Sequence, residues 1–229
     1  MRILPLLPFL LLTLLATLSS NAESPLSFDS LKKSVTVEAN ALKTTVPYTF
    51  ENTSKNTVTI SRWDSACSCL NARIKGSKMT YKPGEKGEIR IDFELGSFSG
   101  TQAKTVMLWT EKDSAASPSI ILTAAVTIPT LFEISPKSLV WDMNDTKEPK
   151  TFKIKVHDDK PINISNHNGT NDTFPYTIKT IKEGWEYEIT VTPSDVSTPS
   201  IGMIKINTDS KIKRYQRQQA FVYVRTKKK

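Results

Sequence analysis

The sequence predicts an all-β fold of two tandem antiparallel β-sandwich domains behind an N-terminal export signal. Hydrophobic and polar residues alternate over most of the chain, and no stretch carries apolar residues at a convincing helical spacing. Short alternating segments recur at regular intervals with polar turns between them, which is typical of sandwiches. The same layout begins again about half-way along the 229 residues, as expected for a degenerate repeat of roughly 90 to 100 residues.

Residues 1–22 predict a cleaved export signal. Arg2 supplies a short positive start, an almost wholly apolar run follows, and Ser20 and Ala22 are small residues at the positions that a signal peptidase reads. The run contains two prolines and is shorter than the roughly 20 residues that a membrane span requires. We therefore expect cleavage after Ala22, no stable transmembrane segment, and an exported protein that is periplasmic or secreted.

The net charge is +8, and it falls to +7 (8 − 1) when Arg2 leaves with the signal. Much of the excess positive charge lies in the C-terminal segment, residues 211–229. Two interpretations stay open, namely binding to an anionic surface or polymer, and a solvated strand with a charged tail. The second is expected because a basic tail alone is a weak signal. Nucleic acid is not an expected partner of an exported protein.

The clearest strand is expected in residues 88–95. Ile89, Ile91 and Phe93 would face a core while the charged residues between them face water. Pro83 and Gly84 precede this strand and favour a turn, since Pro presets φ and Gly tolerates positive φ. Further strands of the first half are expected in residues 46–50, 58–60, 106–109 and 120–128.

The second half repeats the pattern. Its strands are expected in residues 132–134, 152–156, 162–164, 176–178, 185–191, 204–206 and 221–224, and the Asn- and Thr-rich residues 166–173 are expected to form a loop. The boundary falls near Pro129 and Thr130, which gives domains 23–129 and 130–229. Because no Gly- or Ser-rich linker occurs there, we expect the two domains to be held in a fixed relation.

Three pieces of the first half occur in the order and spacing of a known family, and they are residues 48–53, Cys67-Ser68-Cys69, and residues 83–93. Together they resemble bacterial exported domains of unknown function with a Cys-x-Cys signature, which are related to the ASH/Hydin group. The resemblance covers residues 28–128, and it implies an immunoglobulin-like sandwich in an exported setting with no established activity. The second half is similar only in strand pattern and lacks cysteine.

Cys67 and Cys69 are the two cysteines of the chain and its main chemical candidates. In an extended strand their Cα atoms would lie about 6.5 to 7 Å apart, at the limit of what a disulfide spans. A strained disulfide would suit a redox role, and two thiolates with Met79 would suit a soft metal such as Cu(I). Both thiols could also pack as small apolar groups. A structural role is expected, and Ser68 in place of the family's usual Gly favours two packed thiols.

Other catalytic patterns are missing from the sequence. Gly96 and Gly100 frame Phe98 where a nucleophile elbow has serine. The two histidines, His157 and His167, lie in polar segments of the second half, away from both cysteines in sequence. No catalytic residue, cofactor site or metal site is therefore expected.

The sequence thus predicts a non-catalytic exported interaction or cell-envelope structural module, not an enzyme, whose partner is an unknown protein or envelope polymer. Such sandwiches bind through end loops or by adding a strand to a sheet edge. The alternative is a thiol redox or Cu(I)-binding protein that uses Cys67 and Cys69. Among the four tryptophans, Trp109 and Trp185 are expected in the core.

Overall fold

The computed structural model describes residues 24–226 and is nearly all β, as predicted. The predicted export signal in residues 1–22 and the last three lysines lie outside the described residues. Seventeen strands and two short 3₁₀ turns make up the regular structure of the described part. None of its helical segments is long and apolar enough to cross a membrane.

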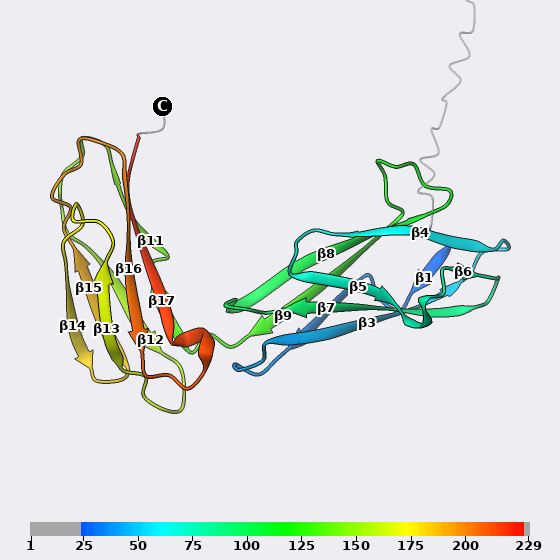
Figure 1. Cartoon of the computed structure of the whole chain (residues 1–229), viewed down its shortest axis with the longest axis horizontal. Helices are drawn as coiled ribbons and strands as arrows, with labels where there is room; N and C mark the ends of the chain where they lie inside the picture. The colour runs from blue at the N-terminus through cyan, green and yellow to red at the C-terminus, as the bar shows by residue number, and fades with distance from the viewer. Residues whose placement is uncertain (1–23, 227–229) are drawn as a thin grey trace, which may run out of the picture.

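The first half of the described chain forms two sheets around one hydrophobic core (Figure 1). One sheet has the strand order β1-β3-β7-β5 and the other has the order β2-β9-β8-β4-β6. β2 and β9 run parallel, and the other neighbours are antiparallel. The strands are β1 Leu26–Phe28, β2 Lys32–Thr36, β3 Lys43–Asn52, β4 Val58–Ser65, β5 Leu70–Ile74, β6 Thr80–Tyr81, β7 Lys86–Glu94, β8 Gly100–Thr110 and β9 Ile120–Ile128, and the first 3₁₀ turn is η1 Lys75–Ser77.

The second half builds two further sheets, with the orders β10-β12-β15-β14 and β11-β17-β16-β13. These orders repeat those of the first half once β6 is set aside, and the parallel pair β2 and β9 has its counterpart in β11 and β17. The two halves therefore share a topology, and equivalent positions can be compared. The strands are β10 Phe132–Ser135, β11 Ser138–Asp142, β12 Lys150–Val156, β13 Ile164–Gly169, β14 Tyr176–Lys182, β15 Glu186–Val191, β16 Ser200–Thr208 and β17 Arg217–Arg225, and the second 3₁₀ turn is η2 Lys213–Tyr215.

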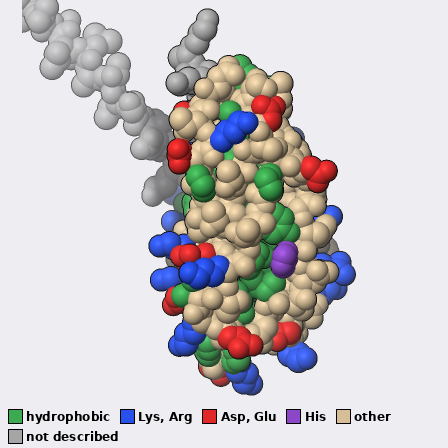
Figure 2. All heavy atoms as spheres, turned by 90° about the vertical axis from the view of Figure 1, so that its left-hand side faces the viewer, with side chains coloured by type: hydrophobic (Ala, Val, Ile, Leu, Met, Phe, Trp, Pro, Cys, Tyr) green, Lys and Arg blue, Asp and Glu red, His purple; other side chains and the backbone are tan. Residues whose placement is uncertain are grey.

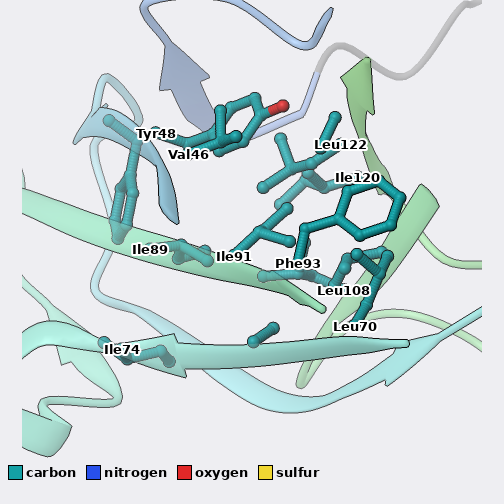
Figure 3. Close-up of a cluster of buried hydrophobic side chains, with 14 of the residues drawn as sticks. Val46, Tyr48, Leu70, Ile74, Ile89, Ile91, Phe93, Leu108, Ile120 and Leu122 are labelled. Carbon is teal, nitrogen blue, oxygen red and sulfur yellow. The ribbon is translucent and has the colours of Figure 1, made fainter. Parts of the chain in front are cut away.

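The first core lies between the two sheets of the first half, and its alternating side chains confirm the predicted strands (Figure 3). Ile89, Ile91 and Phe93 of β7 are buried, because period-2 alternation sends every second residue of the strand inward. Tyr48 of β3 crosses the core, and its hydroxyl donates to the Thr123 carbonyl of β9 at 2.7 Å. Burial raises the pKa of Tyr48 to about 12. One polar contact therefore ties the two sheets together inside an apolar layer.

The second core is a separate cluster between the sheets of the second half. Trp141, Phe152 and Ile189 are almost wholly buried in it. Trp185 is half-buried and packs against this core, as predicted. The division of the chain at residues 129–130 stays a prediction, although sheets and core residues group into one set on each side of it.

Two expectations from the sequence need correction. Residues 166–173 are not wholly a loop, because β13 extends to Gly169 and pairs with β16 through backbone hydrogen bonds that need no apolar side chains. Trp109 is buried, but it is not a member of the first core cluster. It faces outward from β8, and the guanidinium of Arg62 covers it at 3.9 Å from the ring centre.

The junction between the halves depends on η2. Arg214 is only 6% exposed, and its guanidinium donates to the carbonyls of Ala41 and Phe98, both in loops of the first half. The Tyr215 hydroxyl donates to the Pro129 carbonyl beside the boundary. Three backbone carbonyls thus hold the turn that precedes β17, and the fixed relation of two domains stays a prediction.

Replacing Arg214 with Ala should loosen the junction. The carbonyls of Ala41 and Phe98 would lose their donors, which costs about 1–3 kcal/mol when such groups stay buried. We expect urea unfolding followed by tryptophan fluorescence to separate into two transitions, because each half carries two tryptophans. Lys211→Ala, an exposed change just before η2, is the matched control. A single transition with an unchanged midpoint in Arg214→Ala would contradict this role.

Stability should fall in acid partly because of Asp92 on β7. Arg73 donates to the Asp92 carboxylate at 2.8 Å and Thr45 donates at 2.6 Å, and these bonds lower the pKa of Asp92 below its usual value of 3.8. A lowered pKa in the folded state stabilises the fold above the unfolded pKa of about 3.9, and that contribution is lost as pH falls through the folded value. Asp92→Asn should flatten the decline of the urea midpoint below about pH 4. Glu111→Gln controls for the loss of one negative charge, and an unchanged pH profile in Asp92→Asn would refute the assignment.

Candidate functional site: the disulfide corner between β4 and β5

The two predicted cysteines lie where the chain crosses from one sheet of the first half to the other. β4 belongs to the sheet β2-β9-β8-β4-β6, and β5 is the edge strand of the sheet β1-β3-β7-β5. Residues 66–69 make the crossing between Ser65 and Leu70. The segment therefore has to leave one hydrogen-bonded ladder and enter another within four residues.

The structure joins Cys67 and Cys69 in a disulfide, so the expectation of two packed thiols is wrong. The segment is a turn, in which the Leu70 amide donates to the Cys67 carbonyl at 3.2 Å, and the two Cα atoms lie 5.2 Å apart. That separation is within the usual range for a disulfide. Ser68 is exposed, and among the described non-glycine residues only Ser77 and Asn144 have positive φ. The turn therefore does not need a glycine at position 68.

Each side of the disulfide is fixed to a different sheet. The Ala66 amide donates to the Thr105 carbonyl of β8 at 3.0 Å, and the Cys69 carbonyl accepts from the Glu94 amide at the end of β7 at 2.9 Å. Both cysteines are half-buried and pack against the first core. The covalent bond therefore closes a corner whose two ends are already held by backbone hydrogen bonds.

The equivalent corner of the second half, between β13 and β14, has no cysteine. There the side-chain Nδ2 of Asn171 donates to the Ser200 hydroxyl and to the Ile201 carbonyl, each at 3.0 Å. The side-chain Oδ1 of Asn171 accepts from the backbone amide of Thr173 at 2.8 Å. Phe174 is buried in the second core beside it. The same crossing is thus made with hydrogen bonds and one apolar anchor, which favours a structural role for the disulfide.

Met79, the third predicted metal candidate, serves the fold. Its backbone carbonyl accepts from the Ile60 amide at 2.9 Å, and its side chain packs against the first core. Within residues 24–226, no group of three or more His, Cys, Asp and Glu side chains is placed to hold a metal ion. His157 contacts Glu133 at 2.8 Å and His167 contacts the Tyr176 hydroxyl at 3.0 Å, both in the second half. Sulfurs in a disulfide are not thiolates, so a soft-metal site would first require reduction.

The sequence reasoning missed Trp63, an aromatic residue exposed beside the corner. Trp63 lies on β4 and is 38% exposed. β6 covers the outer edge of β4 only opposite Val58 and Thr59, so no described strand pairs with this edge from Ser61 onward. Residues 61–65 do not alternate between apolar and polar side chains, and this lack of alternation could have indicated an exposed part of the strand.

The backbone around Trp63 is open to a partner. Because the Ala66 amide bonds to β8, the alternation of an antiparallel ladder turns the amide and carbonyl of Asp64 toward β8 and those of Trp63 and Ser65 away from it. The Ser65 amide is satisfied by the Asp64 carboxylate at 2.8 Å. The amide and carbonyl of Trp63 therefore point away from the sheet beside the exposed indole.

Arg62 holds this edge in place from the outer face of the sheet. Its guanidinium lies over the Trp109 ring and also donates to the Ala115 carbonyl at 2.6 Å. The contact ties β4 to the loop between β8 and β9. The strand that carries Trp63 is thus fixed on one side by Arg62 and at its end by the disulfide corner.

Comparisons with known proteins find one family model that is similar to the first half. A family model described as "Protein of unknown function (DUF1573)" matches residues 26–126. That stretch runs from β1 into β9 and contains the disulfide corner. No curated protein matches the chain. The proposed link to ASH/Hydin domains stays a prediction.

Solved structures with a related arrangement share little sequence with this chain. A protein of unknown function from Porphyromonas gingivalis W83 has 12% identity and a TM-score of 0.37, covering 88% of this chain and 100% of that one. The E. coli chaperone DraB has 12% identity and a TM-score of 0.33, covering 86% and 96%. The YadV chaperone has 8% identity and a TM-score of 0.33, covering 86% and 100%.

Loss of the disulfide should weaken the fold without abolishing it. The loop closed by Cys67 and Cys69 is so short that chain entropy predicts a contribution of only about 1.5 kcal/mol. We expect Cys67→Ser/Cys69→Ser to keep its β-rich circular dichroism spectrum and to lose about 1–2 kcal/mol of unfolding free energy. Thiol titration should find no free thiol in the native protein and two after reduction, and Ser68→Ala is the control. Unfolding of the first half in the double variant would contradict this expectation.

Proposed function

We propose that the protein is a non-catalytic, exported interaction module of the cell envelope that binds an extended polypeptide segment along the free edge of β4. The observation that carries the proposal is Trp63, an exposed indole beside backbone groups that no described strand satisfies. The export signal that the sequence predicts in residues 1–22 is the reason for placing the protein in the envelope.

The chemistry of the edge selects the partner. An amide and a carbonyl that point sideways from a strand are complemented by the backbone of another extended strand. The indole of Trp63 adds an apolar contact, and tryptophan is enriched among residues that dominate binding energy. We therefore expect a segment of a few residues in extended conformation, with an apolar side chain that packs on the indole.

The charged neighbours are already engaged. Arg62 covers Trp109, and the Asp64 carboxylate caps the Ser65 amide. Selectivity then depends on strand pairing and on the contact with Trp63, more than on ion pairs. The disulfide corner and Arg62 keep the edge in one shape, which lowers the ordering cost of binding.

The alternative function, thiol redox chemistry or Cu(I) binding by Cys67 and Cys69, stays a prediction. Both sulfurs are engaged in the disulfide, and the second half makes the equivalent corner without them. A structural role for the Cys67–Cys69 disulfide therefore favours the binding module over the redox protein.

A displayed library of random peptides tests the proposal. Panning against residues 23–229, with counter-selection against Trp63→Ala, should enrich peptides with alternating apolar residues and few prolines, since proline lacks the amide that strand pairing needs. Synthetic versions of the selected peptides should bind Trp63→Ala at least about 30-fold more weakly, as for a dominant interface residue. Hydrogen exchange should show protection of the Trp63 amide on binding.

The matched control for this experiment is Ile181→Ala. Ile181 is also exposed and lies on β14, an edge strand of the second half. This variant should bind the peptides as the unaltered protein does. Equal binding to Trp63→Ala, or protection confined to other strands, would overturn the proposal.

A further inference from the structure

The outer face of the sheet β11-β17-β16-β13 carries an apolar patch where a sandwich normally has polar residues. Val140, Tyr223 and Ile201 form one row across β11, β17 and β16, and Phe221 and Met203 lie side by side in the next row. All five alternate with buried core residues and therefore point away from the core. Ile201 is 61% exposed, and Phe221 and Tyr223 stack with ring centres 6.4 Å apart. We call these five residues the sheet-face patch.

The first half has the same topology, so its outer sheet face shows which side chains folding requires there. On its equivalent strands β2, β9 and β8, the outward rows are Thr36, Thr127 and Thr101, then Ser34, Ala125 and Ala103. Small and hydroxyl side chains thus suffice at these positions, and apolar residues such as Met107 and Ile121 lie further along β8 and β9. Ile201 is exposed and the other four residues of the sheet-face patch are partly exposed. Their large apolar side chains are therefore not required by the architecture, and contiguous apolar residues at a surface mark contact sites.

The charge around the sheet-face patch is positive in sum, from Lys205, Arg217 and Arg225 against Asp142. Lys205 and Arg217 lie on the same face beyond the patch, and Arg225 lies at its other end. The acid of this face, Asp142, pairs with Arg225 at 2.8 Å. After Thr226 the sequence continues into three lysines. The face therefore combines an apolar centre with a basic margin.

The opposite sheet of the second half is different. On its outer face Lys153, Glu188 and Lys179 alternate in one cross-strand row, and Lys155, Glu186 and Lys182 alternate in another. Figure 2 looks at the second half from the left of Figure 1, and acidic and basic side chains are interspersed on that side. Mixed charge is the ordinary way to keep a sheet face soluble. The basic margin is thus a property of the face that carries the patch.

The sheet-face patch is also away from the junction between the halves. Tyr215 of η2 contacts Pro129, and Tyr223 lies six residues along β17 from Arg217, which corresponds to about 20 Å of extended chain. β17 ends on the far side of the second half from the junction (Figure 1). The patch is accordingly free for a partner outside the chain.

We propose that this face binds the surface of an anionic lipid bilayer. Apolar and aromatic side chains enter the boundary between headgroups and acyl chains, while lysine and arginine pair with lipid phosphates, and two such signals together give stable membrane attachment. A second copy of the chain would oppose Lys205 and Arg217 with the same charges. A soluble polyanion would use the basic margin and leave the apolar centre in water. The patch offers one hydrogen-bonding group, the Tyr223 hydroxyl, which suits a fluid surface better than directional recognition of a protein.

Vesicle binding by residues 23–229 tests this inference, since that chain contains every described residue and omits the predicted export signal. We expect co-sedimentation with vesicles of equimolar phosphatidylglycerol and phosphatidylcholine at about 0.1 M salt, and weaker binding at about 0.5 M. Vesicles of phosphatidylcholine alone should bind far less. Ile201→Ser/Tyr223→Ser should bind the anionic vesicles on the order of tenfold more weakly.

Ile121→Ser is the matched control, because Ile121 is an exposed apolar residue on the outer face of β9, the counterpart of β17, where it pairs with Met107. Circular dichroism and thermal melting should be unchanged in the patch variants, since both residues lie outside the core; Ile201→Ser alone gives a second variant.

Failure of the unaltered chain to bind anionic vesicles would overturn the inference, as would equal binding by the patch variants. A dimer in sedimentation that the patch variants convert to monomer would assign the face to a second copy. Patch-dependent binding to soluble polyglutamate without vesicle binding would assign it to an acidic polypeptide. The β4 edge is not involved, so Trp63→Ala should bind vesicles normally.

Discussion

The crossing between two sheets at the β4–β5 corner is the constraint on which the first half depends. A sandwich keeps its sheets about 10 Å apart, and here the chain must pass from one to the other within residues 66–69. The Ala66 and Cys69 backbones are bonded to different sheets, and the disulfide closes the turn between them. This corner fixes where β4 ends, and therefore which way the backbone of Trp63 faces. The Cys67–Cys69 disulfide and the exposed edge of β4 are thus parts of one local arrangement.

The junction at η2 extends this order from one half to the other. Arg214 is a buried cation that is satisfied by carbonyl oxygens, and its Nε atom has no hydrogen-bond partner. Burying a charge whose polar atoms are not all paired costs free energy of folding. We therefore interpret Arg214 as a residue that fixes the position of η2 and not as one that raises stability. Because Arg214 and Tyr215 lie in η2, just before β17, the same contacts that join the halves also set the start of the strand that carries Phe221 and Tyr223.

Alternation let the sequence predict most buried strands, and its failures share a cause. Ile89, Ile91 and Phe93 could be placed because one face of β7 is apolar and the other charged. β13 was taken for a loop because an edge strand rich in Asn pairs through its backbone, which composition does not reveal. The disulfide was missed because the Cα separation was taken from an extended strand, whereas residues 66–69 turn. The sheet-face patch was missed because Phe221, Val222, Tyr223 and Val224 are apolar in succession, so the pattern cannot say which of them face outward.

The shared topology of the halves separates what the fold requires from what has been added to it. The corner is made once with a disulfide and once with Asn171, so cysteine is not a requirement of the crossing. At equivalent positions the outer face carries Thr, Ser and Ala in the first half and the sheet-face patch in the second, so aromatic residues are not a requirement at those positions. The family match ends at residue 126, before either second-half feature begins. The two halves therefore keep one architecture and differ in surface chemistry, with strand pairing available at the β4 edge and a basic apolar face on the second half.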